Sequence, residues 1–258
     1  MSHILPQNNN QPVVNVEISP PDGKEKRVID GIYGKNEVIS GIKNAIEKIE
    51  KENPDKIITI GGNCIVSLAP FDYLHGKYDN VGIIWIDAHP DVSTVKNGYP
   101  NAHAMVLGSL MGYGDKSSSD LMKNKYFQSD EILYVGLQDL HDYQRQFLDE
   151  AGVNYKIQTN EFVSDQDILS FIKKHENILV HFDVDVLDEK LFYSTYFAND
   201  ELTGDGSGGG KMTFDQLERT LHCITENANV VGFTIAEYLP FDEYKLYKMF
   251  SQMNMFTE

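Results

Sequence analysis

Three short acidic clusters in this chain each follow directly on an apolar run that is typical of a β-strand. The clusters occupy residues 87–91, 183–188 and 236–240. A carboxylate at the end of an apolar strand is costly to keep ionised in low-dielectric surroundings unless a positive group neutralises it. A pair of divalent metal ions is the simplest such group. The pattern therefore predicts strands whose ends gather around metal.

Five apolar runs are predicted to be strands: residues 57–60, 81–86, 132–137, 178–182 and 230–235. Helical segments separate them, and this alternation predicts a mostly parallel sheet covered by helices on both faces. The expected fold class is therefore α/β, with three layers in an αβα arrangement. Ligands of such sheets bind outside the carboxyl ends of the strands, and every acidic cluster lies at that end.

The helical segments have recognisable starts and stops. Apolar residues recur at helical spacing from Val38 to Ile49, and Pro54 ends that segment. Two further helices are predicted to begin at capping boxes, in which a hydroxyl residue is followed three positions later by Asp or Gln. These pairs are Ser164 with Asp167 and Thr213 with Gln216.

Composition narrows the class of protein. The 258 residues can bury a full core, and we expect one domain over residues 13–258 after a polar, disordered segment at 1–12. The net charge of -17 argues against nucleic acid or an anionic membrane as partner and favours a cationic substrate. The two cysteines, Cys64 and Cys223, are far apart in the sequence and do not give the pattern of a disulfide-stabilised protein, which suits a reducing compartment. With neither a signal peptide nor a membrane span in the sequence, we expect a cytoplasmic protein.

The acidic clusters have the spacing of metal ligands. Asp87, His89 and Asp91 alternate, so an extended backbone projects them to one side, and Asp183 and Asp185 have the same spacing. These hard and borderline donors suit manganese. One carboxylate from each cluster could bridge two metals about 3.5–4 Å apart, which would lower the pKa of a shared water towards neutrality. A single motif of this kind is also compatible with a polar loop.

His181 is a different case from these candidate ligands. It lies in the middle of a predicted strand, beside Phe182. We interpret it as a hydrogen-bonded core residue or a neighbour of the ligands, in preference to a ligand.

The sequence resembles the ureohydrolases, the family of arginase, agmatinase and formiminoglutamase, from Ile57 to Pro240. Five segments carry the resemblance. They are Gly61-Gly62-Asn63-Cys64 (Gly-Gly-Asp-His in the family), Asp87-Ala88-His89-Pro90-Asp91 (Asp-Ala-His-x-Asp), the Asp-x-Asp strand at residues 182–188, the segment at residues 208–213, and the late glutamate Glu237.

The resemblance implies an arginase-like fold and a binuclear manganese site. Asp87 and Asp183 would bridge the two ions. His89 and Asp185 would complete one ion and Asp91 the other, whose remaining ligand is histidine in the family and Cys64 here. The resemblance also implies that the protein is a trimer or hexamer.

The resemblance further implies a urea-releasing reaction through a metal-bridging hydroxide. His103 matches the family's proton-shuttle histidine, and Glu237 would hold a guanidinium or amidine group by paired charged hydrogen bonds. With the ligand Asp91, these two form the predicted catalytic set. Ser93 falls at a position where arginases bind the amino-acid end of the substrate, and Asp142 could still meet an α-ammonium group there.

Several residues depart from the family pattern. Cys64 is a softer donor than histidine. It could complete the site with an altered metal preference (zinc, iron or cobalt), leave one ion weakly held, or mark a protein that has lost catalysis. Ser93 replaces an asparagine, and His141 and Gln144 replace acids. The substrate therefore stays open among arginine, N-hydroxyarginine, agmatine and related compounds.

Two other classes of function compete with the hydrolase. The first is a non-catalytic binding or regulatory protein on the same fold. The second is a histone-deacetylase-like amide hydrolase, which uses one zinc ion. The paired Asp183 and Asp185 and the retained Asp91 favour a binuclear site over the second.

Overall fold

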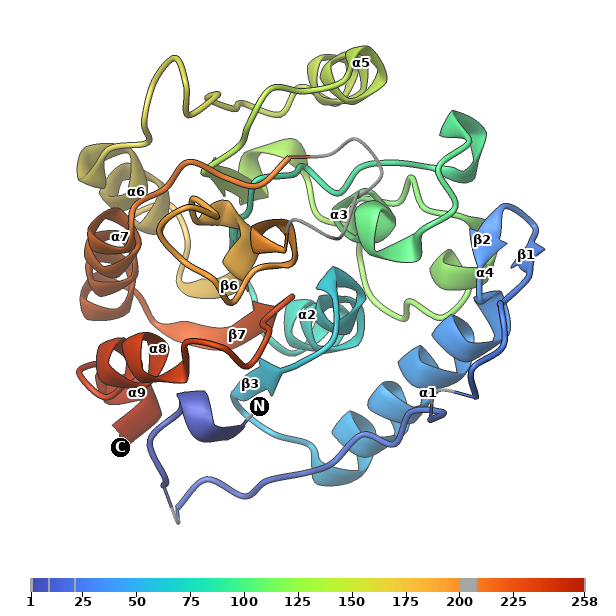
Figure 1. The fold of residues 1–258 in the computed structure, drawn as a ribbon, viewed down its shortest axis with the longest axis horizontal. Coiled ribbons are helices and arrows are strands. Elements are labelled where there is room, and N and C mark those ends of the chain that lie inside the picture. The colour runs from blue at the N-terminus through green and yellow to red at the C-terminus, as the bar shows by residue number, and fades with distance from the viewer. Residues whose placement is uncertain (1, 9, 21, 200–207, 258) are drawn as a thin grey trace.

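A five-stranded parallel sheet forms the centre of the molecule (Figure 1). The structure is a computed structural model that describes residues 2–8, 10–20, 22–199 and 208–257. The strand order is β3-β7-β6-β4-β5. The strands are β3 (Ile57–Ile60), β4 (Val81–Ile86), β5 (Ile132–Val135), β6 (Asn177–Asp183) and β7 (Val230–Ala236). All five predicted strands are confirmed.

Helices cover both faces of the sheet, as the αβα prediction requires (Figure 1). In β4, Ile83 and Trp85 face one layer, whereas Ile84 and Ile86 face the other, because successive side chains of a strand point to opposite sides. The first layer contains α1 (Lys35–Glu52), α2 (Leu68–Lys77), α3 (Val106–Leu110) and α5 (Asp142–Ala151), and the second contains α6 (Asp165–Ile172), α7 (Phe214–Asn227), α8 (Glu243–Phe250) and α9 (Asn254–Thr257).

The remaining short elements lie at the margins of this sandwich. β1 (Val28–Ile29) and β2 (Ile32–Tyr33) form an antiparallel hairpin ahead of α1, and α4 (Lys116–Ser119) follows α3. None of the described helices has the length and apolar character needed to cross a membrane.

The predicted helix boundaries are confirmed at their caps. Ser164 and Thr213 each accept a backbone hydrogen bond from the third residue of the following helix, and each capping box is complete. α1 ends at Asn53, whose left-handed backbone precedes Pro54. Such caps satisfy backbone groups that the helix itself leaves unpaired.

The N-terminal segment packs against the domain. Residues Ser2–Ile4 form a 3₁₀ helix, and Ile4 is fully buried in the core beside α8. The expected disorder of residues 1–12 was inferred from their polar composition. Composition does not show that the apolar side chain of Ile4 packs into the second layer. Residues 1 and 9 lie outside the described part of the chain.

The strand order brings the loops after β4 and β6 together. β4 and β6 are neighbours, although the chain leaves β4 towards β5 and returns to β6 only later. Such a reversal of direction opens a crevice at the carboxyl edge of a parallel sheet. Ile86 pairs with Phe182 across this junction, so Asp87 and Asp183 are next in register on adjacent strands.

Candidate metal centre

Four strand ends deliver acidic or thiol side chains to the carboxyl edge of the sheet. Asp87 follows β4, Asp183 ends β6 and Glu237 follows β7. Cys64 begins the 3₁₀ helix η2 (Cys64–Ser67), four residues beyond the end of β3. The predicted gathering of these residues at one edge is what the structure shows.

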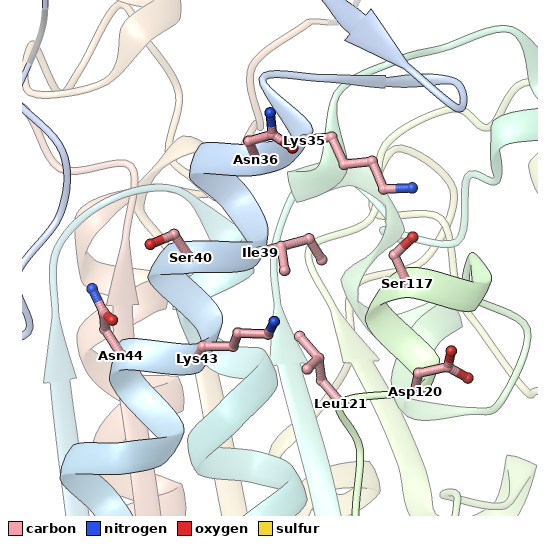
Figure 2. A pocket seen from close by; sticks show the side chains of 9 residues that line it. All are labelled: Lys35, Asn36, Ile39, Ser40, Lys43, Asn44, Ser117, Asp120 and Leu121. Carbon is pink, nitrogen blue, oxygen red and sulfur yellow. The ribbon is translucent and has the colours of Figure 1, made fainter.

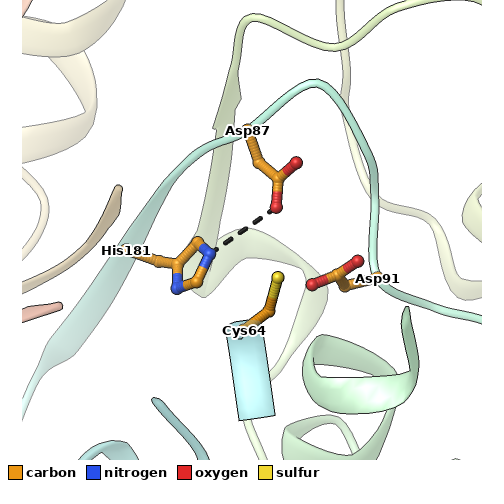
Figure 3. Close-up of side chains that lie close together, drawn as sticks. All are labelled: Cys64, Asp87, Asp91 and His181. Atoms are coloured by element: carbon orange, nitrogen blue, oxygen red, sulfur yellow. Dashed lines mark ion pairs between the residues drawn. The ribbon is translucent and has the colours of Figure 1, made fainter. Parts of the chain in front are cut away.

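Within the described residues, the candidate ligand atoms form three overlapping groups, in each of which all atoms lie within 4.8 Å of one another. The first, which we name the Cys64 subsite, consists of Cys64, Asp87, Asp91 and His181 (Figure 3). The second, the His89 subsite, consists of Asp87, His89 and Asp185. Asp87 belongs to both, which is the placement that a bridging carboxylate needs.

Asp183 and Glu237 connect to the Cys64 subsite. The Sγ atom of Cys64 donates a hydrogen bond to Oδ2 of Asp183 at 3.0 Å. The three side chains Cys64, Asp183 and Glu237 also lie within 4.8 Å of one another through their ligand atoms. On the other side, Nδ1 of His89 is 3.1 Å from Oδ2 of Asp185.

The centre contains buried polar atoms that lack protein partners. Within the described residues, Nε2 of His89, Oδ2 of Asp91 and Nε2 of His181 are buried and have no hydrogen-bond partner. Buried polar groups are nearly always paired, so such atoms need an explanation. A metal ion in the Cys64 subsite would satisfy Oδ2 of Asp91 and Nε2 of His181, and a donor set of carboxylates, imidazole and thiol suits a first-row divalent metal. These residues therefore fit a binuclear metal centre.

Burial and crowding of negative charge shape the electrostatics of the centre. Burial, together with neighbouring carboxylates, holds the pKa of Asp91 and of Asp183 well above the usual range. The same two causes raise the pKa of the Cys64 thiol, and they raise the pKa of Glu237 to about 7. Asp87 differs because its contacts with His181 and His89 outweigh its burial and lower its pKa to about 2.

Metal uptake is expected to release protons and to weaken as the pH falls. Groups with a raised pKa, such as Asp91, Asp183 and the Cys64 thiol, retain protons at pH values where they would normally be ionised. An entering cation must displace those protons, so its apparent affinity rises with pH. Calorimetric Mn²⁺ titrations in buffers of different ionisation enthalpy should show release of about one or more protons per ion. Binding heats that are identical in all buffers would contradict this prediction.

Two of these carboxylates sit on strained backbone. Asp91 has a φ of 51° and Glu237 a φ of 59°, values in the left-handed region that non-glycine residues rarely adopt. Such strain costs about 1–3 kcal/mol per residue and persists where the surrounding structure imposes it. The backbone N–H of Glu237 donates to the carbonyl of Gly62 at 2.9 Å, which ties the end of β7 to the loop that carries Cys64.

Gly210 fixes the loop that presents Asp185. Its N–H donates to the carbonyl of Asp185 at 2.6 Å, and a Cβ at this position would lie 1.8 Å from the carbonyl oxygen of Val186. Gly210→Ala is therefore expected to destabilise the protein by about 2–3 kcal/mol, a decrease of several degrees in Tm. Gly208→Ala is the matched control because a Cβ there meets nothing within 4 Å. Equal Tm values for both variants would contradict this account.

The other predicted site residues lie around the centre at different depths. His103 is half-buried on the 3₁₀ helix η4 (Ala102–Met105), which packs against η2. Ser93 is buried, and its hydroxyl is 3.0 Å from the hydroxyl of Tyr143 on α5. Asp142 is exposed as the first residue of α5. The Ser93–Tyr143 contact thus links the loop after β4 to the start of the helix that carries Asp142.

Trp85 was not identified from the sequence as a site residue, and His181 was interpreted there as a core residue or a neighbour of the ligands. Trp85 donates from Nε1 to Oδ2 of Asp87 at 3.0 Å, and His181 lies 3.6 Å from the same oxygen. Trp85 and His181 are register partners on β4 and β6, and their rings stack at 3.7 Å. Both residues have the same position in the sequence pattern. Trp85 lies two residues before Asp87 on β4, and His181 lies two residues before Asp183 on the adjacent strand β6.

A surface cavity of about 560 Å³ lies apart from this centre (Figure 2). Side chains of α1, such as Ile39 and Lys43, face Ser117 and Leu121 across it. Its one carboxylate, Asp120, is ion-paired with Lys116. None of the candidate metal ligands lines this cavity.

A comparison with known protein families shows to which family this chain belongs. The model of the Arginase family matches residues 13–246. The chain belongs to the arginase family. Among curated relatives, this arginase-family protein is 28% identical to an arginase of Staphylococcus aureus strain MSSA476 over 187 residues, which cover 69% of this chain and 60% of that arginase. The matched region thus spans less than two thirds of that relative.

Solved structures share the fold of this arginase-family protein. An arginase from Entamoeba histolytica, crystallised in complex with L-ornithine, has a TM-score of 0.74 at 20% identity and covers 91% of this chain and 81% of its own. A putative agmatinase from Clostridium difficile has a TM-score of 0.58 at 23% identity and covers 92% and 73%. The predicted ureohydrolase membership and arginase-like fold are confirmed.

Proposed function

We propose that this arginase-family protein is a metal-dependent hydrolase that cleaves a C–N bond of a small guanidino or amidino compound, releasing urea from a guanidino compound or an amide from an amidine. The observation that carries the proposal is the pair of overlapping subsites, together with the buried atoms of the Cys64 subsite that have no protein partner. Two Mn²⁺ ions would be held by Cys64, Asp87, His89, Asp91, Asp183 and Asp185, with Asp87 and Asp183 as bridges. When bound, the ions would lower the pKa of water so that it attacks at neutral pH.

The protein's own side chains would handle the substrate. Glu237 lies beside Cys64 and Asp183 and would accept paired hydrogen bonds from the guanidinium or amidine group. His103 would transfer a proton to the departing amine, a role that suits a histidine near neutral pH. Ser93 and Asp142 would bind the far end of the substrate, on the side of the centre where α5 begins.

The substrate class follows from charge. A protein of net charge -17 with Glu237 at its centre favours a cation, and arginine, N-hydroxyarginine and agmatine all carry a cationic guanidinium-type group. The structural neighbours include an arginase with bound L-ornithine and a putative agmatinase, and both kinds of substrate stay within the proposal.

The cellular location, oligomeric state and partners of the enzyme are part of the same proposal. Both cysteines are free thiols, which suits a cytoplasmic protein. We further propose a homo-oligomer, a trimer or hexamer, with small molecules and neither nucleic acid nor membrane as its partners.

The test combines metal analysis with a screen for turnover. Protein purified without chelator would be assayed for metal per chain, for urea release from guanidino compounds and for amide release from amidines. Two ions per chain and urea or an amide from one substrate are expected. One ion or none, with no turnover after reconstitution with Mn²⁺, would indicate a non-catalytic protein on the arginase fold in place of the hydrolase.

A further inference from the structure

The Cys64 subsite contains a histidine that is additional to the ligand set implied by the family resemblance. His181 lies in the middle of β6, has no exposed surface, and directs Nε2 towards Asp87 and Cys64 (Figure 3). Its ring stacks on the indole of Trp85, with an interplanar angle of 9°. The position of Nε2 is thus fixed by the sheet and by a stacked neighbour.

The hydrogen bonding of His181 leaves Nε2 available. Its Nδ1 atom is 2.8 Å from the hydroxyl of Ser67, which is also fully buried. With Nδ1–H donating to that oxygen, Nε2 carries a lone pair, and within the described residues it has no hydrogen-bond partner. This is the outer-sphere arrangement that orients metal-binding histidines in proteins.

Nε2 of His181 also contacts Asp87, as an ion pair. The distance from Nε2 to Oδ2 of Asp87 is 3.6 Å, longer than a hydrogen bond. That oxygen already accepts the indole N–H of Trp85 at 3.0 Å. Two ligand atoms of one ion lie at most about 4.6 Å apart, close to the 4.8 Å within which His181, Cys64, Asp87 and Asp91 present their ligand atoms.

We propose that Nε2 of His181 ligates the metal ion of the Cys64 subsite and supplies there the imidazole that residue 64 lacks. The inference rests on the metal site of the proposed function and not on its substrate. Position 64 would then contribute sulfur from η2, and β6 would contribute the nitrogen donor. The mixed sulfur, nitrogen and oxygen set would favour Co²⁺, Fe²⁺ or Zn²⁺ over Mn²⁺ at this subsite.

The direct test is a bond between metal and nitrogen. Protein labelled with ¹⁵N in its histidines and loaded with ¹¹³Cd²⁺ should show one-bond cadmium–nitrogen coupling at two histidines, His89 and His181. Only one coupled histidine should remain in His181→Phe, which keeps a ring against Trp85. The matched control is His75→Phe, because His75 is also buried and stacked, on Phe127, away from the candidate ligands. Both coupled signals should survive in this control.

Metal affinity gives a second readout. His181→Phe should weaken Co²⁺ binding at one of the two sites by more than about 100-fold, and Ser67→Ala should weaken it by about 10–100-fold. The wild-type coupling experiment needs no variant, so it stands even if His181→Phe fails to fold.

The outcomes separate the inference from the proposed function. Cadmium coupled to His89 alone in the wild-type protein would overturn the role of His181 while leaving the metal centre intact. Failure of Cd²⁺, Co²⁺ and Mn²⁺ to bind at all would overturn the metal centre and the inference together. Two coupled histidines without urea or amide release would support the inference and count against the hydrolase alone.

Discussion

Cys64→Ala is expected to lower the affinity of one of the two metal sites by at least about 100-fold and to abolish most turnover. Loss of an outer-sphere partner of a metal ligand costs about 10–100-fold, and loss of a ligand should cost more. Cys64 is buried and contacts Asp183, so nothing else in its surroundings can supply sulfur. Elemental analysis and Co²⁺ titration, followed by the near-ultraviolet band of a cobalt–thiolate bond, would measure the change.

Two companion variants sharpen this test. Cys223→Ala removes the other free thiol, which lies on α7 and should leave both metal binding and turnover unchanged. Cys64→His restores the family residue and should shift the metal preference towards Mn²⁺, because imidazole is a harder donor than thiolate. Full activity and two ions per chain in Cys64→Ala would show that the thiol is not a ligand.

Glu237→Gln is expected to reduce kcat/KM by about 10²–10³-fold while both ions remain bound. A hydrogen bond between charged groups contributes about 1.5–3 kcal/mol, and the carboxylate would make two of them to the cationic group of the substrate. The amide keeps the shape of the side chain but lacks its charge and offers one acceptor. Urea-release kinetics beside metal analysis of the same sample would make the comparison.

The control for this variant is Glu226→Gln. Glu226 is an exposed carboxylate on α7, near His222, so its neutralisation changes the net charge by the same amount without touching the centre. Its kinetics should match those of the wild-type protein. Loss of metal from Glu237→Gln, in place of loss of substrate affinity, would instead make Glu237 a ligand.

The sequence was sufficient for the central strands because β4, β6 and β7 are buried along their whole length, whereas β3 at the edge of the sheet is only partly buried. Residues 57–60 and 81–86 were predicted to the residue, since continuous apolar runs between polar turns leave little freedom. The third strand ends at Val135, two residues earlier than predicted, because Gly136 adopts a φ of 98° and turns the chain. Apolar composition alone does not report such a turn.

The sequence could predict those site residues that lie directly after a strand. The structure brings Cys64, Asp87, Asp91 and Asp183 together because parallel strands end at one edge. His181 required knowledge of which strands are neighbours, since its contact with Asp87 depends on the pairing of β4 with β6. The strain at Asp91 and Glu237 was likewise invisible, because it is imposed by tertiary packing and not by local preference.

The indole that supports His181 also provides an intrinsic fluorophore. Trp85 is the chain's one tryptophan, stacked on one candidate ligand and hydrogen-bonded to another. Its emission should therefore respond to filling of the Cys64 subsite. Paramagnetic Mn²⁺ or Co²⁺ would quench it strongly, and diamagnetic Zn²⁺ would only shift it. The unmodified protein can thus report its own ion occupancy optically, in real time and without a label.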